Sequence, residues 1–203
     1  MAVTGAALFG FVVAHLIGNL QVYLGPEAMN DYGVFLREVF HGAGLWILRV
    51  GLLAAAVLHV WAATSLTLES RKARDVGYRE LKWRESTYAS RTMRWSGVIV
   101  LVFVVYHLMH FTFGNAHPSF IEGDVYHNFV AGFRSVPVSL VYIFAMILLG
   151  LHIRHGFWSM FQTLGVSHPR YMRMAHTAAW IFAALIVLGN ISFPLAVLAG
   201  YVK

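Results

Sequence analysis

Six histidines lie inside long apolar stretches of this sequence, where ionisable side chains are costly and usually mark function. They are His15, His59, His107, His110, His152 and His155. Neutral imidazole is a good axial ligand for haem iron, and a pair of histidines fills both axial positions, so that the iron transfers electrons and does not bind oxygen. A lone histidine in a membrane is more often an interhelical hydrogen-bonding group, but six of them over four consecutive apolar stretches favour ligands.

Five apolar stretches can position these histidines, and each is close to the length of about 20 residues that a helix needs to cross a membrane. Only 12% of the residues are charged and 59% are hydrophobic, with a mean hydropathy of +0.65. Because backbone groups in lipid must be hydrogen-bonded internally, we predict an all-α integral membrane protein with one domain, residues 1–203. The predicted spans are residues 2–24, 44–68, 95–113, 136–160 and 175–200.

Depth in the membrane pairs the histidines. At about 1.5 Å per residue, His15 and His107 each lie about 18 Å from the predicted cytoplasmic edge. His59 and His152 lie about 12–14 Å from the same edge. Axial ligands of one haem must face each other at similar height. We therefore expect the first four spans to form a haem-binding four-helix bundle, with His15 and His107 ligating the outer haem iron and His59 and His152 the inner one.

A weak internal repeat favours the same four residues. The pairs lie at matching separations, since His15 to His107 is 92 residues and His59 to His152 is 93. The apolar residues around each member also agree, and a small residue follows four positions after both His59 and His152. The repeat therefore selects His107 over His110 and His152 over His155.

Other polar residues are candidates for contacts with haem propionates or with quinone. The inner candidates for propionate contacts are His155, Arg94 and Arg154. Snorkelling at the membrane edge explains the two arginines equally well. The outer candidates for haem or quinone contacts are His110, Asn19 and Tyr23. For His110, a simple packing role is the alternative.

The positive charge predicts the orientation. Residues 69–94 form a basic loop with eight Lys or Arg, and Arg170 and Arg173 lie on the same side, against only Arg37, Arg134 and Lys203 on the other. Short loops rich in Lys and Arg stay in the cytoplasm, so we expect a cytoplasmic N-terminus. Topology explains most of this charge, and interleaved aromatic residues make the loop a candidate docking surface for a cytoplasmic partner. We expect no binding to nucleic acid, because the loop is tethered at the membrane.

Stretches across nearly the whole chain resemble the cytochrome b subunit of the succinate dehydrogenase and fumarate reductase family, in its single-chain, five-helix, di-haem form. They are residues 15–21 (HLIGNLQ) with 25–26 (GP) and 30–32 (NDY), residues 91–95 (RTMRW) leading to 106–108 (YHL), residues 124–128 (DVYHN), and residues 150–152 (GLH) with 155–156 (HG) and 158–159 (WS). In that family the first four helices each supply one haem ligand, and those positions fall on His15, His59, His107 and His152.

The resemblance implies the membrane anchor of succinate:quinone oxidoreductase, respiratory complex II, in the bacterial inner (cytoplasmic) membrane. It implies two haem b groups, surrounding lipid, and a quinone of the menaquinone or ubiquinone type. It also implies a flavoprotein subunit with FAD that oxidises succinate and an iron–sulfur subunit that relays electrons, in a complex that is a homotrimer or a dimer. This chain has no Cys and no GxGxxG motif, so the flavin and the iron–sulfur clusters belong to partner subunits and the chain does not oxidise succinate itself.

Two other functions stay open. A b-type cytochrome of another quinone-linked membrane oxidoreductase, such as a hydrogenase or formate dehydrogenase, shares the haems and docks a different partner. A transporter or assembly factor with histidine relays binds no haem and is colourless. In some members of the resembled family a carboxylate near the outer haem takes part in proton transfer, and the sequence offers Glu38, Glu122 and Asp124 without fixing their depth.

Overall fold

The computed structural model describes residues 1–73, 88–166 and 168–203, and these residues include five helices that are long and apolar enough to cross a membrane. They are α1 (Ala2–Asn19) with its continuation η1 (Leu20–Leu24), α3 (Ala43–Lys72), α4 (Tyr88–His107), α6 (Val136–Thr163) and α7 (Pro169–Leu198). For the described residues, the prediction of an all-α protein with five helices that are suited to span a membrane is confirmed. The helices α3 and α4 extend into both ends of the predicted loop 69–94, and the middle of that loop lies outside the described residues.

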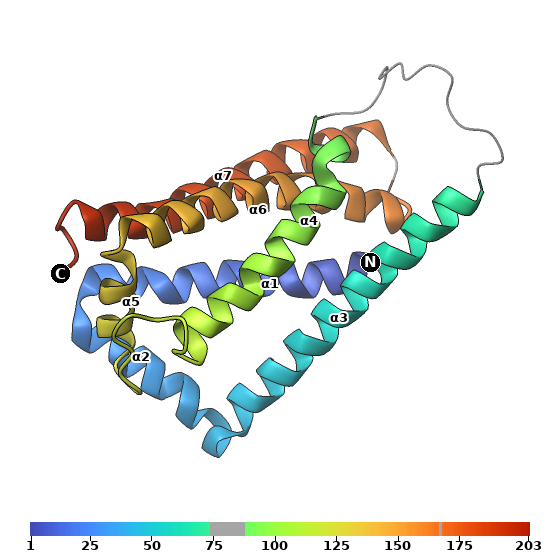
Figure 1. Cartoon of the computed structure of the whole chain (residues 1–203). Helices are drawn as coiled ribbons and strands as arrows, with labels where there is room; N and C mark the ends of the chain where they lie inside the picture. Colours follow the sequence, from blue (N-terminus) through green and yellow to red (C-terminus); the bar gives the residue numbers. More distant parts are fainter. Residues whose placement is uncertain (74–87, 167) are drawn as a thin grey trace.

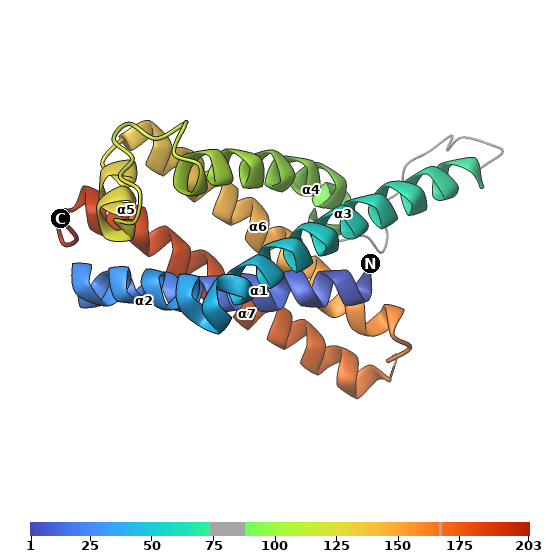
Figure 2. The same ribbon diagram turned by 90° about the horizontal axis from the view of Figure 1, so that it is seen from below.

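Two short helices that were not predicted cross one end of the long helices, at the end where the C-terminus lies (Figures 1 and 2). The helix α2 (Pro26–Glu38) follows Gly25, whose φ of 103° makes the turn, and starts with Pro26 at a position where the missing N–H is tolerated. The helix η2 (Val39–Gly42) then reverses the chain into α3. The second short helix, α5 (Val125–Phe133), lies between the π-helical turn η3 (Leu108–Thr112) and α6.

The helix α6 lies at the centre of the arrangement, where α1, α4 and α7 pack against it, while α3 packs against α1 (Figures 1 and 2). Small buried residues on α7 follow one another at intervals of four: Ala175, Ala179 and Ala183. Such small residues let helices approach closely in lipid, where van der Waals contact drives packing. The helix α7, which forms the fifth span, thus packs along α6.

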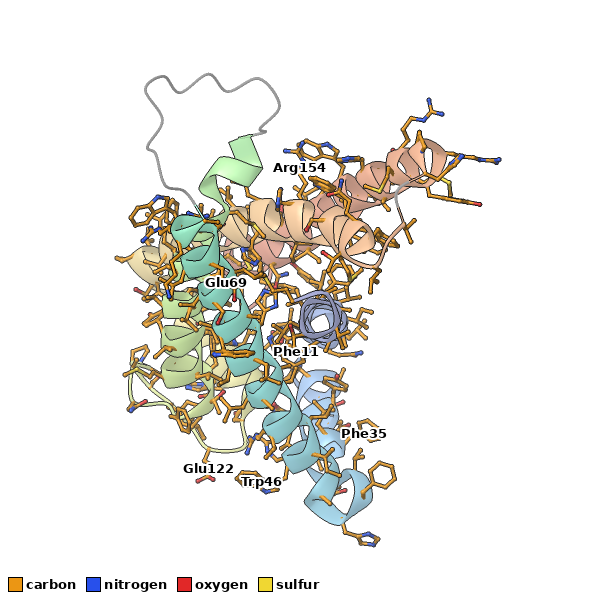
Figure 3. The ribbon with its side chains drawn as sticks, turned by 90° about the vertical axis from the view of Figure 1, so that its right-hand side faces the viewer. Phe11, Phe35, Trp46, Glu69, Glu122 and Arg154 are labelled. Carbon is orange, nitrogen blue, oxygen red and sulfur yellow. The ribbon has the colours of Figure 1, made fainter. Side chains whose placement is uncertain are left out.

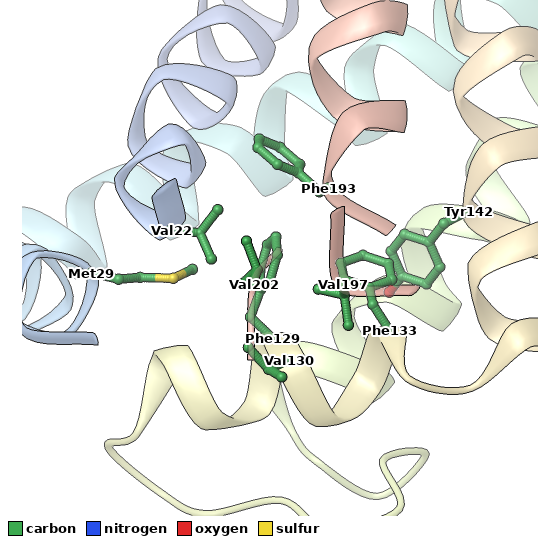
Figure 4. Close-up of a cluster of buried hydrophobic side chains, with 9 residues drawn as sticks. All are labelled: Val22, Met29, Phe129, Val130, Phe133, Tyr142, Phe193, Val197 and Val202. Atoms are coloured by element: carbon green, nitrogen blue, oxygen red, sulfur yellow. The ribbon is translucent and has the colours of Figure 1, made fainter. Parts of the chain in front are cut away.

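A hydrophobic core lies at the end of the bundle where α5 inserts between the long helices (Figure 4). Its members are buried side chains from η1, α2, α5, α6, α7 and the C-terminal turn: Val22, Met29, Phe129, Val130, Phe133, Tyr142, Phe193, Val197 and Val202. Many large apolar side chains elsewhere are exposed, for example Phe35 on α2 (Figure 3) and Trp46 and Trp61 on α3. An apolar outer surface of this extent suits a chain surrounded by lipid.

Candidate functional site

The four histidines that were predicted as haem ligands face one another in two pairs across the bundle. His15 on α1 and His107 at the end of α4 have ring centroids 5.8 Å apart, with their planes at 86°. His59 on α3 and His152 on α6 have ring centroids 6.4 Å apart, with their planes at 61°. The structure therefore brings these side chains together in the same two pairs that depth predicts.

The ring separations fit two imidazoles on opposite sides of one metal ion. Two such rings have centroids about 6 Å apart, because each metal–nitrogen bond is about 2 Å and each ring centre lies about 1 Å behind its nitrogen. Both measured separations are close to this value. In the described part of the chain, no group of three or more His or acidic side chains gathers around a metal-sized site. Each pair can thus supply two axial ligands to a metal whose other positions are filled by a macrocycle.

The neighbours of His59 determine which of its nitrogens is free. Thr4 on α1 donates its hydroxyl proton to the carbonyl of Met1, with an Oγ1–O distance of 3.0 Å. Its Oγ1 also lies 3.1 Å from Nδ1 of His59. Because a hydroxyl has one proton, Thr4 accepts in this second bond, and Nδ1 of His59 carries a hydrogen. Nε2 of His59 then keeps its lone pair and can ligate iron.

A glycine lies against each imidazole of the second pair. A Cβ on Gly5 of α1 would lie 3.4 Å from Cε1 of His59, and a Cβ on Gly97 of α4 would lie 3.4 Å from Cε1 of His152. A methyl group at either position would be in van der Waals contact with the imidazole ring. Nδ1 of His152 is buried and has no hydrogen-bond partner among the described residues.

The Tyr142 hydroxyl on α6 bridges two histidines at the other end of α4. Its oxygen lies 3.3 Å from Nδ1 of His107 and 3.0 Å from Nδ1 of His110. The tyrosine has one proton, so at least one of the two histidines donates to it. If His107 ligates through Nε2, its Nδ1 donates to Tyr142, and Tyr142 donates to His110.

His110 lies in the π-helical turn η3 and is 0% exposed. Its ring stacks on Tyr106 and on His117, with centroids 5.5 and 4.9 Å away. His117 donates from Nε2 to the carbonyl of Asn128 on α5. Nε2 of His110 has no partner among the described residues. His110 thus belongs to a buried polar cluster around Tyr142, and π-helical turns of this kind often mark functional positions.

The inner candidates occupy separate surroundings. The Arg154 guanidinium lies 3.8 Å from the ring centroid of Trp180 on α7 (Figure 3), a cation–π contact that favours the snorkelling role. His155 lies beside Trp158, with ring centroids 5.2 Å apart, and its buried Nδ1 has no partner among the described residues. Arg94 is exposed near the start of α4.

The remaining outer candidates lie along η1 and the end of α1. The Tyr23 hydroxyl is 2.7 Å from Oγ of Ser192 on α7, so this side chain joins η1 to α7. Asn19 is half-buried at the last residue of α1. Tyr23 therefore turns toward α7, whereas His110 turns toward α6.

The three carboxylates that the sequence offers for proton transfer have different environments. Asp124 caps α5, because its side chain accepts from the backbone N–H of His127 at 2.9 Å and from Nδ2 of Asn30 at 3.1 Å. These bonds hold the pKa of Asp124 below its usual value, the bond from His127 most of all. Glu38 and Glu122 are exposed. Asp124 thus joins α2 to α5 and serves the fold.

The residues around the histidines were not predicted from the sequence, although one signal was available for some of them. The separation of 92 residues that relates His15 to His107 also relates Thr4-Gly5 to Ser96-Gly97. The repeat thus extends to the residues that touch His59 and His152. No comparable signal points to Tyr142, because its contact with η3 forms only in the folded chain.

A comparison with protein families identifies the family of the chain. The sequence model of the family described as the succinate dehydrogenase/fumarate reductase transmembrane subunit matches residues 70–190, which is more than half of the chain. Neither the search of curated proteins nor the search of solved structures gives a significant match. The matched range contains α4, α5, α6 and most of α7, and with them two of the four paired histidines. The chain therefore belongs to the family of transmembrane subunits of succinate dehydrogenase and fumarate reductase.

Proposed function

We propose that this membrane anchor subunit of complex II is a di-haem cytochrome b. In this proposal His15 and His107 hold one haem b, and His59 and His152 hold the other. The observation that carries it is the presence of two facing imidazole pairs whose centroid separations, 5.8 and 6.4 Å, suit axial ligation of a single iron. A bis-histidine haem supplies reversible one-electron transfer and leaves no open position for oxygen.

The surrounding side chains support this assignment. Thr4 leaves Nε2 of His59 unprotonated, and Tyr142 can do the same for His107. Ligating histidines usually donate their second ring nitrogen to such an acceptor, which fixes the tautomer and the ring orientation. The haem sites therefore depend on hydroxyl groups from neighbouring helices as well as on the histidines.

The charge distribution supports an orientation and a docking side. The N-terminus, the end of α3 and the start of α4 lie at one end of the bundle (Figure 1). Since residues 69–94 carry eight Lys or Arg, this end faces the cytoplasm and the C-terminus faces outward. Family membership implies a complex with the catalytic subunits. We place the iron–sulfur subunit on this basic side, from which the anchor carries electrons to a membrane quinone, menaquinone or ubiquinone.

Quantitation of haem in the purified complex tests the proposal. We expect two haem b per chain in the reduced-minus-oxidised spectrum, together with transfer of electrons from succinate to quinone. Alanine at any one of the four paired positions should halve the haem content. The matched controls are His110→Ala and His155→Ala, each three residues from a paired histidine, and both should keep two haems.

The outcomes separate the alternatives. One haem or none per wild-type chain would overturn the di-haem assignment. Loss of haem in a control variant, with full haem in the matching paired variant, would overturn the choice of ligands. A complex with two haems but no succinate–quinone activity, purified with hydrogenase or formate dehydrogenase subunits, would favour another quinone-linked oxidoreductase. The family match argues against that alternative.

A further inference from the structure

The second histidine pair is bordered by two segments that repeat each other. Thr4-Gly5 of α1 lies against His59, and Gly97 of the repeated segment Ser96-Gly97 on α4 lies beside His152. A Cβ on Gly5 would lie 3.4 Å from Cε1 and 3.7 Å from Nδ1 of His59. On Gly97 the corresponding distances to His152 are 3.4 and 3.8 Å. The two glycines therefore present nearly the same surface to the same edge of each imidazole.

The two hydroxyl groups also make the same bond to their own helix. Thr4 donates to the carbonyl of Met1, three residues earlier, at 3.0 Å. Ser96 donates to the carbonyl of Met93, again three residues earlier and at 3.0 Å. Each hydroxyl has thereby used its only proton and can only accept from another group. Ser96 is 2% exposed, so its acceptor lone pairs face the protein interior.

Nδ1 of His59 has a hydrogen-bond partner, whereas Nδ1 of His152 has none among the described residues. Nδ1 of His59 lies 3.1 Å from Oγ1 of Thr4. Nδ1 of His152 is buried without a hydrogen-bond partner among the described residues, and it would lie 3.8 Å from a Cβ on Gly97. A buried N–H without a partner is costly, and Ser96, the residue before Gly97, carries a hydroxyl that can accept.

We propose that Thr4-Gly5 and Ser96-Gly97 are matched positioning sites for the inner haem ligands. In each site the hydroxyl accepts a hydrogen bond from Nδ1 of the ligating histidine, and the glycine gives the ring room to take its orientation. This inference rests on the proposed function, because it assigns a role toward the haem held by His59 and His152. The helices α1 and α4, which carry the outer ligands, thus also orient the inner ones.

The proposed bonds have an effect on the electronic properties of the ligands. Donation from Nδ1 makes an imidazole a stronger electron donor to iron through Nε2. This stabilises the oxidised iron and lowers the midpoint potential. Removal of either hydroxyl should therefore raise the potential of the inner haem and leave the outer haem, which His15 and His107 hold, unchanged.

A redox titration of the purified complex tests the hydroxyl groups. Thr4→Val and Ser96→Ala each remove an acceptor with little change in volume, and Thr4→Ser restores the hydroxyl. The matched control is Thr64→Val, since Thr64 lies on α3 near His59 and its hydroxyl, among the described residues, bonds to nothing but the Val60 carbonyl of its own helix. The component that disappears in His59→Ala identifies the inner haem in the titration.

We expect an upward shift of the inner potential in Thr4→Val and in Ser96→Ala, a value near wild type in Thr4→Ser, and no shift in Thr64→Val. The proposal would be overturned if Thr4→Val and Ser96→Ala both had the same inner-haem potential as Thr64→Val. It would also be overturned if their shifts were confined to the outer haem. If Thr4→Val does not assemble, the Ser96→Ala variant decides the question alone, because it loses a single oxygen atom. A wild-type complex with fewer than two haems would instead refute the proposed function.

The glycines are tested by electron paramagnetic resonance of the oxidised complex, because the ferric signal reports the angle between the two axial imidazole planes. Gly5→Ala and Gly97→Ala should each move the signal of the inner haem. The control Gly51→Ala, where a Cβ meets no atom within 4 Å, should leave it in place. Unchanged spectra in both of the first two variants would overturn the role of the glycines.

Discussion

The Tyr142 hydroxyl is the group on which the buried cluster at the end of α4 depends. It lies 3.0 Å from Nδ1 of His110 and 3.3 Å from Nδ1 of His107, and both Tyr142 and His110 are buried. Tyr142→Phe removes the oxygen and leaves the ring, so the aromatic contacts with Phe103 and Phe133 remain. The variant therefore tests the hydrogen bonds separately from the packing.

The size of the effect follows from the burial of His110. An interhelical hydrogen bond in a membrane contributes about 0.6 kcal/mol on average. A fully buried polar group that loses its partner costs about 1–3 kcal/mol. His110 is 0% exposed, and its Nε2 already has no partner among the described residues, so the second effect dominates. We expect Tyr142→Phe to lower the free energy of unfolding by about 2 kcal/mol, which is about 30-fold in the unfolding equilibrium constant.

Reversible unfolding of the purified complex in mixed micelles, followed by far-UV circular dichroism, measures this change. The matched control is Tyr106→Phe, a tyrosine that stacks on His110 and contacts Tyr142 but whose hydroxyl forms no hydrogen bond within the described residues. It should change the free energy of unfolding by less than about 0.5 kcal/mol. In a His110→Leu background, Tyr142→Phe should cost much less than in wild type, because no buried His110 nitrogen is left without a partner.

Equal losses in Tyr142→Phe and Tyr106→Phe would refute the reasoning, since the hydroxyl of Tyr142 would then contribute nothing beyond its ring. An undiminished loss in the His110→Leu background would show that the effect arises at His107 and not at His110.

Three further predictions follow from the packing and the helix caps. Gly150→Ala places a methyl group against Val187 and should lower the free energy of unfolding by about 1–3 kcal/mol, whereas the open Gly51→Ala should be neutral or stabilising in the same assay. Asp124→Ala removes the cap of α5 and should lower the free energy of unfolding by about 1 kcal/mol. Asp124→Asn keeps a capping side chain and should lose less, and equal losses in the two variants would contradict the capping role. Folding lowers the pKa of Asp124, so the ionised carboxylate stabilises the folded chain above the unfolded pKa of about 3.9, and this stabilisation is lost as pH falls through the folded pKa. The free energy of unfolding, measured against pH, should show this loss in wild type and a flatter profile in Asp124→Asn.

The class of the protein follows from the amino-acid sequence alone. Long apolar stretches predict membrane helices because every backbone group in lipid needs an internal partner, and this physical requirement is local to each stretch. The relative depth of a residue follows from its position within a stretch. Depth therefore pairs His15 with His107 and His59 with His152, and the folded chain brings their rings together in those pairs.

Short amphipathic segments escaped the prediction because they do not span the membrane. The helix α2 has neither the length nor the apolar content of a span, and α5 is apolar but has only 9 residues. The positions of both helices depend on contacts with other parts of the chain. Asn30 of α2 donates to Asp124 and accepts from the backbone N–H of Tyr126, so that residues more than 90 positions apart hold the two helices together. Such bonds leave no periodic pattern in either segment.

The groups that surround each histidine depend on the tertiary structure. Thr4 is 55 positions from His59, and Tyr142 is 35 from His107, so neither contact is encoded in a local pattern. A hydrogen bond between helices depends on their rotation and crossing, which many packed side chains determine together. The sequence thus specified the membrane spans and the relative depth of the paired histidines, and the folded chain determined which hydroxyl groups and glycines lie against their rings.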